Sequence, residues 1–226
     1  MVDYQWAVLA QASGGRTMSY WEMLVYPGGG VIGGIIWGLS VVTVALIIHY
    51  FITVRRGNVI PDLVRQQIQG LFDNKQYREA IEVTATEPSM LSYIVHAALG
   101  EAAHGYAAME QAMAEAADER TSDLLRRIEW LNLIGNISPM LGLLGTVWGM
   151  ILAFMEIVKA RGMPPPENLA RSIGIALVTT LLGLAVAIPS LSVFAVIRNR
   201  IDALSSEAVA AAAELIATFR PAPKAA

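Results

Sequence analysis

The chain has 226 residues, of which 55% are hydrophobic and only 15% are charged, against roughly 25% charged residues in a typical soluble domain. Its formal net charge is −3 and its pI is about 5.6, which excludes the strongly basic surface of a nucleic-acid-binding protein. It contains no cysteine and three histidines, so disulfides, thiolate catalysis and cysteine-based zinc sites are excluded. We expect neither a metal site nor a cofactor.

Three uncharged stretches divide the chain. No Asp, Glu, Lys or Arg occurs in residues 23–54, 130–155 and 172–197, and each stretch is longer than the about 20 residues that a membrane-spanning helix needs. The remaining segments carry nearly all the charges and have an ordinary aqueous composition. The sequence therefore predicts an all-α membrane protein with three transmembrane helices and long helical cytoplasmic extensions. It excludes a single water-soluble globule.

The chain is expected to begin with a short outer arm, residues 1–27, followed by the first span at 28–54. Pro27 and the glycines after it break the chain before this span. Within the span, glycines recur at every fourth position, a spacing that favours close approach of another helix. These glycines are Gly30, Gly34 and Gly38.

Residues 55–130 are expected to form a helical cytoplasmic domain. Its first part contains short helices, one that starts at Pro61-Asp62, a typical helix start, and one over residues 77–84. Ser89 is expected to cap the helix that follows.

A long helix is predicted after Ser89. No proline interrupts residues 90–138, and Ala, Glu, Met, Leu and Arg, which favour helix, dominate up to Trp130. We therefore predict one helix that runs from the cytoplasm into the second span, with Gly100 and Gly105 as its weakest points.

The second span is predicted at 131–157, an outer loop at 158–171, the third span at 172–197 and a cytoplasmic helical tail at 198–226. Three consecutive prolines favour a stiff turn in the outer loop. The tail is rich in alanine and is expected to extend the third span as a helix.

The basic residues predict the topology. They follow the first span, precede the second and follow the third: Arg55, Arg56, Arg126, Arg127, Arg198 and Arg200. Because cytoplasmic flanks of spans carry the excess of Lys and Arg, we predict an N-terminus on the outer side of the membrane and a cytoplasmic C-terminus.

Threonines are the informative polar residues within the spans. Thr146 and Thr180 lie about 15 and 12 Å below the outer surface at about 1.5 Å per residue, and Thr179 points about 100° away from Thr180. A hydroxyl at this depth either bonds a backbone carbonyl of its own helix or lines a polar path. Spacing alone leaves both interpretations open.

Other residues near the spans have structural and functional interpretations. Glu156, at the outer edge of the second span, is either an interfacial carboxylate beside Lys159 or a residue where protons enter a path. Pro139 and Pro189 each remove a backbone donor and are expected to bend their helices. No carboxylate is buried in a span, so ion flow through this chain would need a titratable group from another polypeptide.

Two apolar motifs stand out in the second and third predicted spans: residues 138–150 read SPMLGLLGTVWGM, and residues 179–189 read TTLLGLAVAIP. They resemble the second-span and third-span signatures of the MotA/TolQ/ExbB proton-channel family. The three-span layout and the chain length resemble the ExbB and TolQ branches, whereas the MotA branch has a fourth span.

The resemblance implies an ion-driven motor subunit of the bacterial inner membrane. Such subunits form a pentameric ring around two copies of a single-span partner of the ExbD/TolR/MotB kind, and an Asp in the partner's span accepts the proton. By resemblance, the pore-facing residues are Thr146 and Thr180, with Thr179 beside them. The motifs also contain small residues and prolines to which we assign helix packing and bending: Pro139, Gly142, Gly145, Gly149, Gly183 and Pro189.

One position departs from the ExbB and TolQ pattern, which usually has a Glu five residues before the third-span threonine. This chain has Ile175 there. The alternatives are therefore a non-conducting helical membrane scaffold and a sodium-driven motor subunit. An enzyme is not expected, because no nucleophile–base pair or metal cluster lies in a span.

Overall fold

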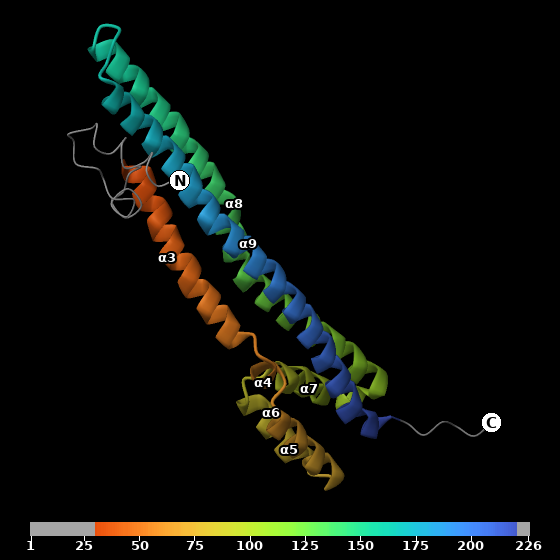
Figure 1. Ribbon diagram of the computed structural model, residues 1–226. Coiled ribbons are helices and arrows are strands. Elements are labelled where there is room, and N and C mark those ends of the chain that lie inside the picture. The colour runs from red at the N-terminus through yellow and green to blue at the C-terminus, as the bar shows by residue number, and fades with distance from the viewer. Residues whose placement is uncertain (1–29, 221–226) are drawn as a thin grey trace, which may run out of the picture. The chain divides into compact units, whose positions relative to one another are not determined.

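The computed structural model describes residues 30–220, and every element in this range is helical (Figure 1). The expected outer arm 1–27 and the last residues of the tail lie outside the described range. The elements are α3 Gly30–Thr53, α4 Arg56–Val59, α5 Asp62–Asp73, α6 Tyr77–Thr86, α7 Met90–Gly100, the 3₁₀ turn η1 Ala102–His104, α8 Tyr106–Lys159, α9 Pro166–Ile216 and the 3₁₀ turn η2 Ala217–Phe219.

Three helices are long and apolar enough to cross a membrane. The apolar segments lie in α3, in α8 with its 54 residues, and in α9 with its 51 residues. This confirms the predicted fold class, an all-α protein with three candidate spans. Helix α9 continues without a break beyond the third apolar stretch to Ile216.

The prediction of one helix from residue 90 into the second span is wrong in its first part. The chain is interrupted between Gly100, where α7 ends, and Tyr106, where α8 begins. Gly105 has a φ of 96°, in the left-handed region that glycine adopts without steric cost. The break therefore falls at the two glycines identified as weak points, and α8 alone runs on into the second apolar stretch.

The connection between α8 and α9 is shorter than the predicted outer loop. It comprises residues 160–165, because α9 begins at Pro166. Proline at the first position of a helix is favoured, since its missing N–H would have no partner there and its φ suits the helix. The third proline of the run thus starts the helix.

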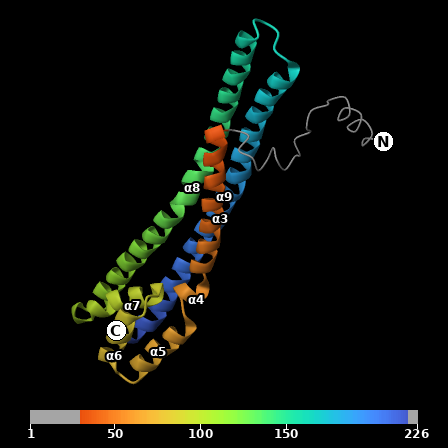
Figure 2. The same cartoon turned by 90° about the vertical axis from the view of Figure 1, so that its left-hand side faces the viewer.

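The chain divides into two compact units. The first comprises the described residues up to Thr43 together with Ile134–Pro189, and the second comprises Val44–Leu133 and the described residues from Ser190 onward. In the first unit, α8 and α9 lie side by side in both views (Figures 1 and 2).

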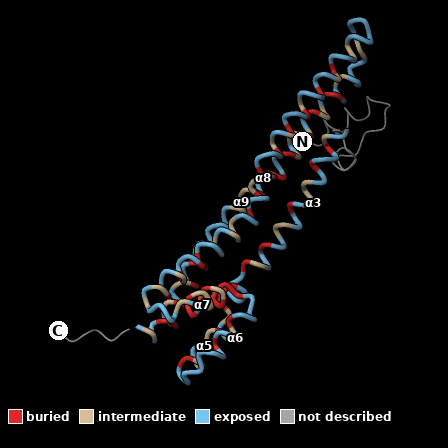
Figure 3. Tube along the Cα trace, turned by 180° about the vertical axis from the view of Figure 1, so that it is seen from behind, coloured by how far each residue is buried: buried red, intermediate tan, exposed pale blue. Residues whose placement is uncertain are grey.

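The second unit contains an apolar core. Helix α5 buries Val64, Ile68 and Phe72, spaced by one helical turn, which is the periodicity of an amphipathic helix. Most residues of helix α7 are buried (Figure 3). The core also receives side chains from α8 and α9, among them Ile128, Leu131, Ile197, Ile201 and Ala208.

Ser89 caps α7 as predicted. Its side-chain oxygen accepts a hydrogen bond from the backbone N–H of Ser92, with an N···O distance of 3.2 Å. This satisfies one of the backbone donors that a helix start leaves without an intrahelical partner.

Candidate ion-pathway site

The contact between α8 and α9 in the first unit is made by small residues. Gly142, Gly145 and Gly149 are buried on one face of α8. A Cβ added to Gly145 would lie 2.2 Å from Oγ1 of Thr179, and one added to Gly149 would lie 2.7 Å from Cβ of Ala176. The two backbones therefore approach so closely that no side chain fits at these positions.

The order of these contacts shows that the two helices run antiparallel. The Cβ position of Gly183 lies 2.6 Å from the carbonyl oxygen of Ser138, while Gly149 meets Ser172 and Ala176 at the other end of the contact. Between them, the Cβ position of Gly142 lies 3.0 Å from Cα of Thr180. Residues nearer the start of the second span thus face residues further along the third.

Thr180 takes part in this contact, and Thr146 directly follows Gly145, which is part of it. The hydroxyl of Thr180 donates a hydrogen bond of 3.2 Å to the carbonyl oxygen of Gly142 on α8. Thr146 follows Gly142 by about one helical turn, and its hydroxyl donates a bond of 2.7 Å to the carbonyl oxygen of Leu143. Both side chains are half-buried, so both keep a surface that another chain or water can reach.

Thr179 has a different environment. Its side chain is 0% exposed and packs against Gly145, and its hydroxyl donates a bond of 2.8 Å to the carbonyl oxygen of Ala176. The angular separation from Thr180 follows from the helical geometry. A role for Thr179 in an ion pathway stays a prediction, and its burial favours helix packing.

Both span prolines lie inside continuous helices, Pro139 in α8 and Pro189 in α9. Hydroxyls lie next to them in the sequence: Ser138 donates to the carbonyl oxygen of Ile134 at 2.7 Å, and Ser190 donates to that of Leu131 at 2.7 Å. The proline ring removes one backbone donor in each helix, and bending at these points stays a prediction.

Glu156 forms an ion pair near the end of α8. One of its carboxylate oxygens lies 3.0 Å from Nζ of Lys159, and the Glu156 side chain is 32% exposed. This is the pair expected for an interfacial carboxylate. A role for Glu156 in proton uptake stays a prediction.

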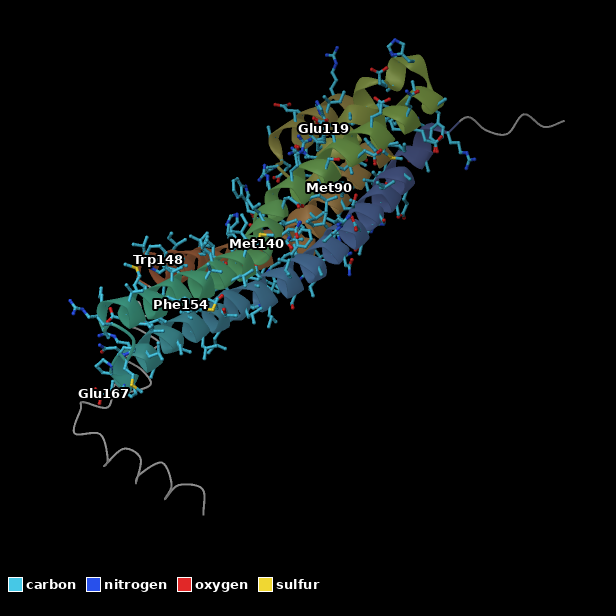
Figure 4. The ribbon with its side chains drawn as sticks, turned by 90° about the horizontal axis from the view of Figure 1, so that it is seen from above. Met90, Glu119, Met140, Trp148, Phe154 and Glu167 are labelled. Atoms are coloured by element: carbon cyan, nitrogen blue, oxygen red, sulfur yellow. The ribbon has the colours of Figure 1, made fainter. Side chains whose placement is uncertain are left out.

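The outward faces of α8 and α9 in the first unit are apolar. Figure 4 shows Met140, Trp148 and Phe154 on α8, whose side chains are 69%, 51% and 66% exposed. Leu177, Leu181 and Ile188 of α9 are similarly exposed, and Ile175 is half-buried. Apolar surface of this extent is expected to face lipid or another protein chain.

A hydroxyl in α3 was not identified as functional from the sequence. The side chain of Thr43 is 2% exposed, and its Oγ1 has no hydrogen-bond partner within residues 30–220. On the same helix, Ser40 lines a cavity of about 90 Å³ together with Leu182 and Val186 of α9. The sequence signal for this site is the presence of two small hydroxyl residues, Ser40 and Thr43, in the middle of an apolar span.

Two of the three histidines, His96 and His104, have side-chain partners. His96 lies within hydrogen-bonding distance, 3.2 Å, of the Thr84 hydroxyl, and Nδ1 of His104 lies 2.7 Å from a carboxylate oxygen of Glu101. Among the described residues, no group of three His, Asp or Glu side chains is placed to hold a metal ion.

Comparison with known proteins gives a match to a family model, the MotA/TolQ/ExbB proton channel family, over residues 78–209. The chain is 30% identical over 186 residues to a putative biopolymer transport protein, an ExbB homolog of Methanothermobacter thermautotrophicus, covering 79% of this chain and 63% of the relative. It is 47% identical over 62 residues to the biopolymer transport protein exbB1 of Vibrio cholerae, covering 27% of each chain.

A third relative is the Tol-Pal system protein TolQ of Haemophilus influenzae, 32% identical over 97 residues, which are 43% of this chain and 42% of the relative. In all three cases the matched segment spans less than two thirds of the relative's length. The matched range includes the motifs at residues 138–150 and 179–189 and the residues of the α8–α9 contact.

Proposed function

Because the chain belongs to the MotA/TolQ/ExbB proton channel family, we propose that it is the channel subunit of a motor that couples the proton-motive force to mechanical work. A member of this family with three long apolar helices is a multi-pass protein of the inner membrane. In the proposed topology, residues 1–27 and 158–171 are periplasmic, residues 55–130 and 198–226 are cytoplasmic, and the spans are 28–54, 131–157 and 172–197.

The observation that carries the proposal is the position of two hydroxyls on facing helices. Thr180 bonds the Gly142 carbonyl across the α8–α9 contact, Thr146 directly follows Gly145 of that contact, and both threonines are half-buried. The apolar stretches that contain them, residues 130–155 and 172–197, have no ionisable group. These hydroxyls can therefore orient and solvate a proton acceptor, but they cannot replace it.

The proton acceptor comes from a partner in this proposal. Two copies of a single-span protein of the ExbD, TolR or MotB kind pass through a pentameric ring of this chain, and an Asp in each partner span lies beside Thr146 and Thr180. Protonation from the periplasmic side neutralises the Asp. The neutral side chain loses its preference for one polar site, because desolvation penalises mainly the charged form.

The energy available is sufficient for a mechanical step. One charge that crosses about 150 mV releases about 3.5 kcal/mol. This biases a two-state conformational step on the order of several hundred-fold. Release of the proton to the cytoplasm then resets the partner Asp for the neighbouring subunit of the ring.

The proposal is tested by native mass spectrometry of the protein purified gently from its own membranes. Five copies of this chain with two copies of a single-span protein that carries a membrane Asp support the motor. A monomer, or a ring without such a partner, contradicts it.

The second candidate function is a non-conducting helical scaffold. It is favoured by Ile175, which stands where ExbB and TolQ proteins usually have a Glu. A scaffold would keep its assembly and its cellular role when the Thr180 hydroxyl is removed, whereas a motor would keep the assembly and lose ion-driven output. A sodium-driven motor would keep the partner and require sodium rather than proton flux.

A further inference from the structure

The second unit contains a cavity of about 200 Å³ between the end of α3, α4, the start of α7 and the middle of α8. Its walls include Asn58, Pro88 and Met90 on one side and Arg120, Asp123 and Arg127 on the other. Met90 is labelled in Figure 4, as is Glu119, which precedes Arg120 on α8. None of these residues takes part in the proposed ion pathway.

Arg120, which lines this cavity, has a side-chain donor without an acceptor in the described part of the chain. Its guanidinium carbon lies 4.2 Å from the centroid of the Tyr93 ring, and the Tyr93 hydroxyl donates a bond of 2.7 Å to Oε2 of Glu119. Stacking on a ring uses the face of the guanidinium and leaves the N–H groups in its plane free to donate. Nε of Arg120 is buried and has no hydrogen-bond partner in the described part of the chain.

A buried donor without an acceptor is costly. We therefore expect Nε of Arg120 to donate a hydrogen bond, in the native protein, to an acceptor that the described part of the chain does not supply. The backbone around the cavity is already engaged: the Asn58 amide donates to the carbonyl oxygens of Ile52 and Thr53 at 3.2 and 3.4 Å, and the carbonyl oxygen of Arg127 accepts from the Tyr50 hydroxyl.

The residues that line the cavity carry more positive than negative charge, so the missing acceptor is expected to be negatively charged. Two basic residues, Arg120 and Arg127, line the cavity together with one acidic residue, Asp123. The Asp123 carboxylate also lies 3.7 Å from the exposed guanidinium of Arg126. Within residues 30–220, neither Arg120 nor Arg127 has an ion pair with an acidic side chain. The cavity therefore favours an anion.

We propose that this cavity binds a phosphate group, with Arg120 and Arg127 as its donors. Guanidinium groups match the oxygen geometry of phosphate and bind it through charge-assisted hydrogen bonds. The volume equals that of roughly seven water molecules at about 30 Å³ each, which admits a phosphate with a small substituent. The phosphate belongs either to a phospholipid headgroup, since the cavity adjoins the end of α3, or to a free phosphate compound.

The test uses the full-length protein with whatever co-purifies from its membranes. Native mass spectrometry measures retention of phosphatidylglycerol during titration, with phosphatidylcholine as a zwitterionic comparison, and thermal unfolding measures stabilisation by inorganic phosphate. The variant Arg127→Gln, at an exposed position, is expected to weaken binding at least about tenfold, as for loss of a hydrogen bond to a charged ligand.

The control is Arg78→Gln on α6, which removes the same charge from an exposed position outside the cavity. It is expected to leave binding unchanged. Arg120→Lys keeps the charge but loses the planar donor set, and is expected to weaken binding while the protein stays folded.

Each outcome decides the proposal. Loss of phosphatidylglycerol in Arg127→Gln but not in Arg78→Gln identifies a lipid headgroup site, and a phosphate-dependent stabilisation lost in the same variant identifies a site for a free phosphate. Equal effects of Arg78→Gln and Arg127→Gln, or no binding of either probe to the unaltered protein, overturn it. An acidic protein segment that co-purifies and is released by Arg127→Gln overturns it as well.

Discussion

Gly145 of α8 and Thr179 of α9 are in direct contact, and a Cβ on Gly145 would lie 2.2 Å from the Thr179 hydroxyl oxygen and 2.5 Å from its Cβ. The Thr179 side chain cannot turn away freely, because it is fully buried and its hydroxyl is bonded to the carbonyl oxygen of Ala176. This pair fixes the distance between the two helices that carry Thr146 and Thr180. The packing of Gly145 against Thr179 therefore affects how far apart the two threonines of the proposed pathway lie.

Replacement of Gly145 by Ala is expected to destabilise the protein by about 1–3 kcal/mol, as overpacking of a close contact does. Thermal unfolding in detergent measures the effect. The control is Gly70→Ala in α5, where an added Cβ would meet no atom of residues 30–220 within 4 Å. That variant should be neutral or slightly stabilising, since alanine favours helix over glycine. Equal stability of the two variants would contradict the close α8–α9 contact.

Replacement of Thr180 by Val is expected to reduce proton flux at least about tenfold, the order expected for loss of one hydrogen bond to a charged group. Flux is measured in vesicles that contain this chain with its co-purified partner, and the assembly is checked by mass. Thr180→Ser keeps the hydroxyl and should retain flux.

Thr179→Val is the matched control for Thr180, because it changes the neighbouring residue in the same way. Its side chain is 0% exposed, so we expect flux close to that of the unaltered protein. Loss of flux equal to that in Thr180→Val would place Thr179 in the pathway, and unchanged flux in Thr180→Val would favour the scaffold.

Replacement of Ser89 by Ala is expected to lower the free energy of unfolding by about 1 kcal/mol, as loss of an N-cap does. Ser89 accepts from the Ser92 N–H and donates a bond of 2.8 Å to the Ser92 hydroxyl. Ser206→Ala removes an exposed hydroxyl that bonds only the carbonyl oxygen of Asp202, and its effect should stay within about 0.5 kcal/mol. Circular dichroism during chemical unfolding compares the two, and equal effects would argue against the cap.

The pKa of Tyr93 is expected to lie above the ordinary tyrosine value. Its hydroxyl donates to the Glu119 carboxylate, and that hydrogen bond is the largest cause of the upward shift. Because the folded state favours the protonated phenol, this contribution to stability is present below the unfolded pKa and is lost as the pH rises through the folded pKa.

Ultraviolet absorbance of tyrosinate, with Tyr93→Phe to identify the signal, measures this titration. Glu119→Gln is expected to lower the pKa of Tyr93, because it removes both the carboxylate acceptor and its negative charge. An unchanged midpoint in Glu119→Gln would contradict the hydrogen bond as the cause.

The sequence by itself determined the three candidate spans and the helical class, because membrane insertion depends on the composition of about 20 consecutive residues. It also placed the helix start at Ser89, which depends on a side chain only three residues from its backbone partner. These features depend only on residues that are close together in the sequence. The motifs at 138–150 and 179–189 likewise identified the family from sequence.

Only the tertiary structure decided which faces of the helices are buried. Gly34 and Gly38 have the same spacing as packing glycines, yet no described residue lies within 4 Å of their Cβ positions, whereas Gly142 and Gly145 meet α9. The unpartnered Arg120 donor also depends on residues distant in sequence, Tyr93 and the walls of α3, α4 and α7. Such contacts join segments far apart in the chain, and helical periodicity specifies a face without specifying what covers it.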